Sequence, residues 1–187
     1  MASAYRYHDM GTPTLGTKFT YSAWVKRSKL TSAQTIASMW KDSNNHIVLR
    51  FDASDNLSFY AYDSSSYAFE LETHDVFKDV SGWYHVVAKV DTTQGTASDR
   101  VKLYVNGVEQ TNLSTSTYPS QNLTFAANAS GTDNYLGARG DGSNYDGLIS
   151  HAHFTDGYAY DASTFGSTDS TTGEWKIKTS PSVTYGN

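Results

Sequence analysis

Residues 82–110 limit the possible folds more than any other part of this chain. Apolar side chains occupy every second position in 84–90 and again in 101–105, which is the pattern of strands with one buried face. The dipeptide Asn106-Gly107 directly follows the second run and readily adopts the two positive φ angles of a type I′ turn. The segment therefore predicts a meander of antiparallel strands. The segment predicts core or near-core positions for four side chains, Trp83, Val101, Leu103 and Val105.

Strand-like runs recur along the whole chain, separated by turns rich in Asp, Asn, Ser and Gly. The predicted strands are residues 18–27, 34–40, 46–51, 57–62, 67–72, 83–91, 100–105, 135–139 and 148–155. No segment sustains an apolar period of 3.6 residues, and only 76–80 and 162–165 are expected to form a helical turn. In a chain of 187 residues this spacing predicts one all-β domain, a sandwich or a barrel.

Charge and composition exclude several classes of function. The chain carries 14 Lys and Arg against 19 Asp and Glu, and its basic residues form no cluster that would bind nucleic acid. Membrane insertion is not expected, because no run of about 18 apolar residues occurs. The N-terminal region lacks the basic and apolar parts of a secretory signal, and cysteine is absent. Assembly in the cytoplasm, without disulfides, is therefore expected.

Aromatic residues make up 14% of the chain and suggest a contact surface. Strand alternation places Trp24, Tyr60 and Tyr62 on the more polar faces of their strands, and Tyr104 lies on a further predicted strand. Tyr and Trp combine an apolar ring with a polar handle, so these four residues are expected to form a ligand-binding platform on an outer sheet face. In the alternative interpretation, loops fold over this face and bury the rings as a second core.

Several segments resemble one family of sandwiches. Residues 19–27 resemble the first long strand of laminin-G-like and pentraxin-like domains, and residues 135–150 resemble their closing strands. Trp83 at the head of a long strand and the Tyr-Val-Asn-Gly turn that ends at Gly107 are also similar to concanavalin A-like jelly rolls. The resemblance implies an antiparallel two-sheet jelly-roll β-sandwich, laminin-G-like, as a single domain over residues 1–187 with its core within 17–178.

Residues 154–176 narrow the resemblance, because they are similar to laminin-G-like domains of bacteriophage tail-fibre and other virion proteins. This implies a non-enzymatic virion-surface domain, assembled in the host cytoplasm, that adheres to host-surface glycan. Other virion proteins are the implied partners, and the chain is expected to be an oligomer in the particle. Family members often continue past the position of Asn187, which would make this chain a piece of a longer protein.

Two other functions stay open at this point. A structural protein that decorates the capsid would use the same aromatic contacts between subunits. A polysaccharide-degrading enzyme is less favoured, because the Glu-x-Asp-x-x-Glu motif of related glycosidases is absent. Its acid and base would have to come from Glu70, Glu72 and His74, which share one strand face.

A calcium site is the cofactor that the resemblance suggests, since laminin-G-like and pentraxin-like domains often bind calcium in rim loops. Asp141, Asn144 and Asp146 offer three hard oxygen ligands within six residues. The alternative is ordinary turn chemistry, in which each of these side chains binds the backbone of its own loop.

Overall fold

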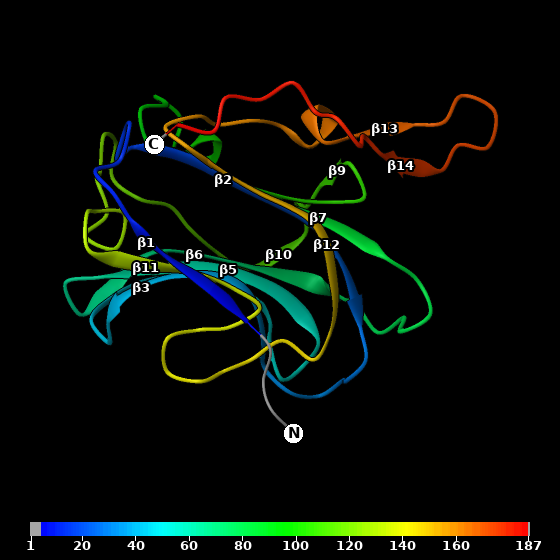
Figure 1. Cartoon of the computed structure of the whole chain (residues 1–187), viewed down its shortest axis with the longest axis horizontal. Coiled ribbons are helices and arrows are strands. Elements are labelled where there is room, and N and C mark those ends of the chain that lie inside the picture. The colour runs from blue at the N-terminus through cyan, green and yellow to red at the C-terminus, as the bar shows by residue number, and fades with distance from the viewer. Residues whose placement is uncertain (1–4, 187) are drawn as a thin grey trace.

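Two antiparallel β-sheets pack face to face across one hydrophobic core in the computed structural model, which describes residues 5–186 (Figure 1). The larger sheet has seven strands in the order β1-β11-β3-β4-β5-β6-β10. Their bounds are β1 (Arg6–Met10), β11 (Thr132–Leu136), β3 (Gln34–Asp42), β4 (Asn45–Phe51), β5 (Asn56–Asp63), β6 (Ser66–Val76) and β10 (Leu113–Thr117).

The smaller sheet has five strands in the order β12-β2-β7-β8-β9. Their bounds are β12 (Gly147–Asp156), β2 (Lys18–Arg27), β7 (Tyr84–Asp91), β8 (Val101–Val105) and β9 (Val108–Glu109). A separate hairpin of β13 (Gly166–Thr168) and β14 (Trp175–Ile177) lies outside this sheet, and the short 3-10 turns are η1 (Ala97–Asp99) and η2 (Ala162–Thr164). The predicted all-β sandwich of two antiparallel sheets is confirmed. Within residues 5–186, no helix is long and apolar enough to span a membrane.

The core confirms the strand alternation of the sequence. Val101, Leu103 and Val105 are buried as predicted, and they face the apolar positions of β7. The prediction that Trp83 is a core or near-core residue is wrong, because its side chain is 39% exposed. Trp83 directly precedes β7, and the alternation of that strand places Trp83 on the outward side together with His85. The inward side begins with Tyr84.

The predicted runs all contain strands, with ends that differ by a few residues. Asn106 and Gly107 have φ angles of 48° and 81°, as the predicted type I′ turn between β8 and β9 requires. The helical turn at 162–165 is confirmed by η2, but residues 76–80 are not helical. The strands that the sequence did not predict are β1, β9, β10, β13 and β14.

A buried ion pair joins the two sheets at one end of the sandwich. Arg27 ends β2 in the smaller sheet, and Asp55 lies in the turn between β4 and β5 of the larger sheet. Their side chains are 0% and 1% exposed, with 2.7 Å between Nη2 and Oδ1. The Thr31 backbone N–H donates to the same carboxylate oxygen, at 2.8 Å. Both charges are thus held away from water by protein partners.

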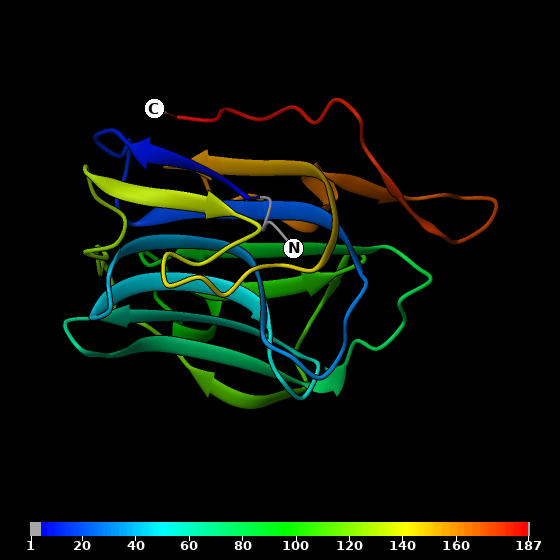
Figure 2. The ribbon, with the colours of Figure 1, turned by 60° about the horizontal axis from the view of Figure 1, so that its bottom comes forward.

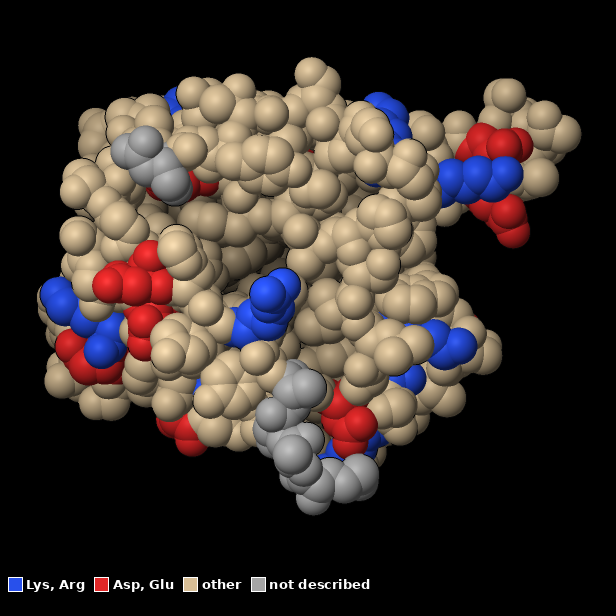
Figure 3. Space-filling model, viewed as in Figure 1, with Lys and Arg blue, Asp and Glu red and all other residues tan. Residues whose placement is uncertain are grey.

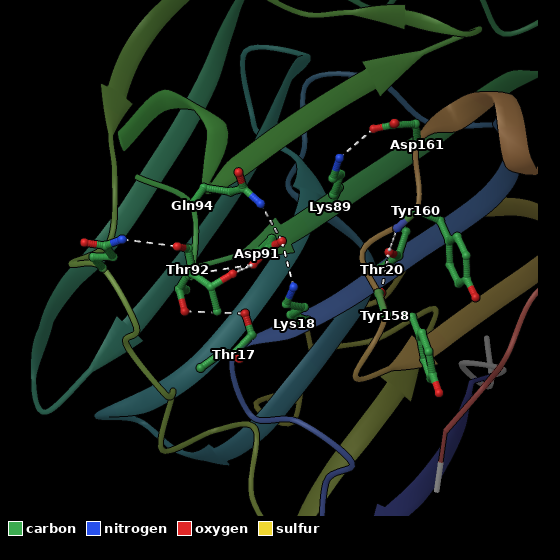
Figure 4. Close-up of polar contacts among 12 residues, drawn as sticks. Thr17, Lys18, Thr20, Lys89, Asp91, Thr92, Gln94, Tyr158, Tyr160 and Asp161 are labelled. Atoms are coloured by element: carbon green, nitrogen blue, oxygen red, sulfur yellow. Dashed lines mark hydrogen bonds and ion pairs between the residues drawn. The ribbon is translucent and has the colours of Figure 1, made fainter. Parts of the chain in front are cut away.

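Residues 158–186, called the covering segment here, run across the outside of the smaller sheet (Figure 2). Figure 4 shows how the segment is attached near its start. The Thr20 hydroxyl donates to the Tyr158 carbonyl and accepts from the Tyr160 backbone N–H, at 2.9 and 2.8 Å. Lys89 of β7 pairs with Asp161 at 2.7 Å. The outer face of the larger sheet is covered in part by the loop 137–146 and carries the candidate site.

Candidate functional site

Aromatic side chains line up across four neighbouring strands on the outer face of the larger sheet. The cross-strand register pairs Trp40 of β3 with His46 of β4, His46 with Tyr62 of β5, and Tyr62 with Tyr67 of β6. Side chains directly opposite each other on antiparallel strands lie within contact distance on the same face. These four residues and Tyr60 are called the platform below.

The rings of the platform touch in sequence. Trp40 stacks on His46 with 4.7 Å between ring centroids, and His46 stacks on Tyr62 at 5.4 Å. Tyr62 meets Tyr67 edge to face at 5.0 Å, and Tyr60 meets Tyr67 at 5.7 Å. Tilted and edge-to-face contacts of this kind stabilise aromatic clusters beyond simple burial. The platform is therefore one connected, rigid set of rings.

The platform has a buried part and a part that is accessible to solvent. Tyr60 and His46 are buried, whereas Tyr67 is 54% exposed and Trp40 and Tyr62 are half-buried. Burial lowers the pKa of His46, which favours its neutral form. A ligand would reach the rings of Tyr67, Tyr62 and Trp40.

Charged groups border the platform on the β4 and β6 side. The Arg50 guanidinium carbon lies 5.0 Å from the centroid of the Tyr60 ring. Glu70 lies opposite Tyr60 on β6, and desolvation together with the charge of Glu72 raises the pKa of Glu70. The edge of the platform thus offers both hydrogen-bond donors and acceptors.

The loop 137–146 folds over the β3 side of the platform (Figure 2). Its Arg139 donates to the Tyr60 hydroxyl at 2.8 Å and lies 5.4 Å from the Trp40 ring centroid. Gly140 lies against the same ring, so that a Cβ atom there would be 2.2 Å from Trp40 Cδ1. Only glycine permits this approach, and the loop therefore forms one wall of the site.

The four residues predicted as one platform do not share a face. Tyr60 and Tyr62 belong to the platform on the larger sheet, but Trp24 and Tyr104 lie on β2 and β8 of the smaller sheet. Trp24 stacks on His85 at 5.1 Å, and Tyr104 is 8% exposed and donates to Asp161. The grouping is wrong because strand alternation gives the parity of a side chain and not the sheet to which its strand belongs.

For Trp24 and Tyr104, the alternative of a covered second core describes the structure. The covering segment places Ala162 and Phe165 against Val87 and Tyr104, with Tyr160, Trp175 and Val183 packed beside them. The Trp175 Nε1 donates to His85 Nδ1 at 2.9 Å, and the two rings stack. This face is filled by the chain itself.

Comparison with known proteins agrees with this architecture. Residues 3–163 match the sequence family described as the concanavalin A-like lectin/glucanases superfamily. The chain belongs to this superfamily. Among proteins of curated function, none matches the chain.

Solved structures of low sequence identity share the fold of this superfamily member. A heptameric pentraxin from Limulus polyphemus is 15% identical with a TM-score of 0.57, over 84% of this chain and 72% of that chain. Domain 4 of the extracellular arabinanase AbnA from Geobacillus stearothermophilus, solved with arabinotriose, is 21% identical with a TM-score of 0.57, over 85% and 78% of the two chains. A tailspike protein of the Escherichia coli bacteriophage CAB120 is 10% identical with a TM-score of 0.53, over 86% of this chain and 22% of that one.

The sequence did not predict three residues of the platform, namely Trp40, His46 and Tyr67. Trp40 has the parity of Ser38, and His46 that of Val48, so an alternation count alone could have placed both opposite the core face. Tyr67 lies directly after the turn between β5 and β6, where a bulge shifts the register between Ala61 and Tyr62. A bulge of this kind leaves no clear mark in a single sequence.

The residues of the predicted calcium site have protein partners in this structure. Both carboxylate oxygens of Asp141 bind Arg139, and the Asp146 carboxylate accepts from the Ser28 hydroxyl at 2.6 Å. Within residues 5–186, no cluster of three or more Asp, Glu, His or Cys side chains could hold a metal ion. Calcium binding through Asp141, Asn144 and Asp146 stays a prediction of the sequence.

The residues of the enzyme alternative lie on β6. The Glu72 carboxylate accepts from the Ser114 hydroxyl at 3.1 Å, and His74 is exposed near the end of the strand. Glu70 alone lies beside the platform, next to Tyr60 and Tyr67. Glu70 is therefore the residue of the enzyme alternative that borders the platform.

Proposed function

We propose that this chain is a non-enzymatic glycan-binding domain of a bacteriophage virion surface, and that the platform binds the sugar. The observation that carries the proposal is the open edge of the platform, where the exposed Tyr67 and the half-buried Tyr62 and Trp40 lie beside Arg50 and Glu70.

The physical match is between a flat ring surface and a pyranose or furanose. The apolar face of a sugar packs against an aromatic ring, and its hydroxyl groups need donors and acceptors at the rim. Tyr62 and Tyr67 supply the rings, while Arg50 donates and Glu70 accepts. Because the rings already contact one another, little side-chain entropy is lost when a ligand binds.

The relatives support this proposal at the level of the fold. The superfamily is described by lectins and glucanases, and the arabinanase domain was solved with arabinotriose. The virion part rests on the resemblance of residues 154–176 to phage proteins, and the tailspike shares the fold. We also propose many copies per particle, since weak single-site binding becomes firm attachment through avidity.

We propose binding without hydrolysis. Glu70 and Glu72 are successive outward residues of one strand, and Glu72 is bonded to Ser114 on β10. A retaining or inverting glycosidase needs two carboxyl groups on either side of one bond, which neighbours on a single strand provide poorly. Turnover of a bound polysaccharide, abolished by Glu70→Gln, would contradict this part.

The test is glycan binding by Tyr62→Ala and Tyr67→Ala. A glycan array identifies a ligand of the wild type, and calorimetry then measures its affinity for each variant. Loss of one central aromatic contact costs about 1–2 kcal/mol, which corresponds to roughly 5- to 30-fold weaker binding. Trp83→Ala is the matched control, because Trp83 is an exposed aromatic outside the platform.

The outcomes separate the functions. Weaker glycan binding by both platform variants, with the control unchanged, supports the proposal. If particles that carry the folded variants attach normally and assemble poorly, the chain is a structural decoration protein. If a glycan binds equally well to wild type and to both variants, the platform is not the site.

A further inference from the structure

A cavity of about 440 Å³ opens between the two sheets at the edge formed by β1 and β12. Figure 3 shows the hollow on this face of the molecule. The cavity lies on the inner side of the sheets and is therefore separate from the platform, which lies on the outer face of the larger sheet. Its size falls in the range of sites for small molecules.

The walls of the cavity are mostly apolar. Met10, Ile36 and Leu49 come from the larger sheet, and Ala23 and Phe154 come from the smaller one. The Tyr21 hydroxyl donates to the Asn134 side-chain oxygen at 2.7 Å and joins the two sheets beside the cavity. An apolar molecule would find contacts on both sides.

Asp156 of β12 also lines the cavity and is 1% exposed. Its Oδ2 accepts from the Thr14 backbone N–H at 2.5 Å, but its Oδ1 is buried without a hydrogen-bond partner. Within residues 5–186, Asp156 forms no ion pair. Buried carboxylates are ordinarily paired with a cation or fully hydrogen-bonded, so a partly unsatisfied carboxylate in the wall of a cavity points to a missing donor.

We propose that this cavity binds small amphiphilic amines, with the ammonium group on Asp156 and the apolar body between the sheets. An ammonium supplies both the positive charge and the N–H donors that the carboxylate lacks. Arg6 lies on the exposed rim, where water screens its charge. An anionic head group would be repelled by the Asp156 carboxylate.

Octylamine, octanol and octanoate test the proposal, since they share one apolar chain and differ in the head group. Calorimetric titration of the full chain should show saturable binding of octylamine, at least tenfold weaker binding of octanol, and none of octanoate. Asp156→Asn keeps an oxygen for the Thr14 N–H and should weaken octylamine binding by about ten- to a hundredfold.

Two further variants test whether octylamine binds in the cavity or is attracted by carboxylates elsewhere on the protein. Ala23→Leu fills the cavity while Asp156 stays intact, and it should also abolish octylamine binding. Asp146→Asn removes a carboxylate elsewhere and should leave binding unchanged. Melting curves show whether each variant is folded. If a variant does not fold, the comparison of octylamine, octanol and octanoate on the wild type tests the proposal by itself. Octanoate binding as tightly as octylamine, unchanged octylamine affinity in folded Asp156→Asn, or no amine binding to the wild type would each overturn the proposal.

Discussion

Acid should loosen the contact between the covering segment and the smaller sheet through a single buried imidazole. His85 is 0% exposed and lies between the rings of Trp24 and Trp175. The Trp175 indole N–H can only donate, so His85 Nδ1 accepts and His85 Nε2 donates to the Ser22 hydroxyl at 2.9 Å. Both ring nitrogens of His85 are thereby committed to its neutral form.

Burial, together with the charge of His153, lowers the pKa of His85 from 6.5 to about 4. In the unfolded chain this group takes up a proton near pH 6.5, whereas the folded chain resists it until about pH 4. The stabilisation is therefore complete above pH 6.5 and is lost as the pH falls toward 4. At about 1.36 kcal/mol for each pH unit, the loss amounts to about 3 kcal/mol.

Urea denaturation of wild type and His85→Gln at pH 7.5, 6, 5 and 4 measures this loss. The variant should be less stable than the wild type at pH 7.5. Between pH 7.5 and pH 4, the free energy of unfolding of the wild type should decrease by about 3 kcal/mol more than that of the variant. Carboxylates and other histidines titrate in both proteins, so the difference between the two curves isolates His85. His74→Gln, at an exposed site, should keep the wild-type slope. Parallel curves for wild type and His85→Gln would refute the reasoning.

Three more outcomes follow from the structure. Leu103→Ala should lower the free energy of unfolding by about 2–5 kcal/mol in denaturant titration, because it opens a cavity in the core; a loss below about 0.5 kcal/mol would contradict the assigned face. Arg27→Met should cost about 3–5 kcal/mol by the same measurement, since it leaves the buried Asp55 carboxylate without its cation; a more stable variant would show that the ion pair is dispensable. If Asp141, Asn144 and Asp146 bind calcium, millimolar calcium should raise the melting temperature and chelator should reverse the shift; equal melting curves in calcium and in chelator would remove the calcium prediction.

The sequence predicted the sheets better than the site. Alternation in β7 and β8 identifies Val86, Val101 and Leu103 as inward residues, because a two-residue period is a local property of a strand. The assignment of strands to sheets depends on contacts between distant segments. This is why Trp24 and Tyr60 lie on opposite sides of the sandwich, although alternation places both on the outward face of their strands.

The covering segment was the hardest part to predict. Its strands β13 and β14 have three residues each, too short for a periodic pattern. Phe165 and Trp175 read as isolated aromatic residues in a polar stretch, and only the outer side of the smaller sheet gives them partners. The wrong placement of Trp83 has a related cause, since Trp83 takes the outward parity of β7 and the covering segment leaves it 39% exposed.

The covering segment also shifts the physical boundary of the domain. The family match ends at residue 163, but Trp175 lies beyond that point and fits against Gly107 and Gly166 so closely that a Cβ atom at either position would come within 2.5 Å of its ring. A chain cut at the end of the family match would expose Val87 and Tyr104 to water. Recombinant versions of this domain, and searches for relatives with the same architecture, should therefore extend through residue 183, where Val183 completes the packing.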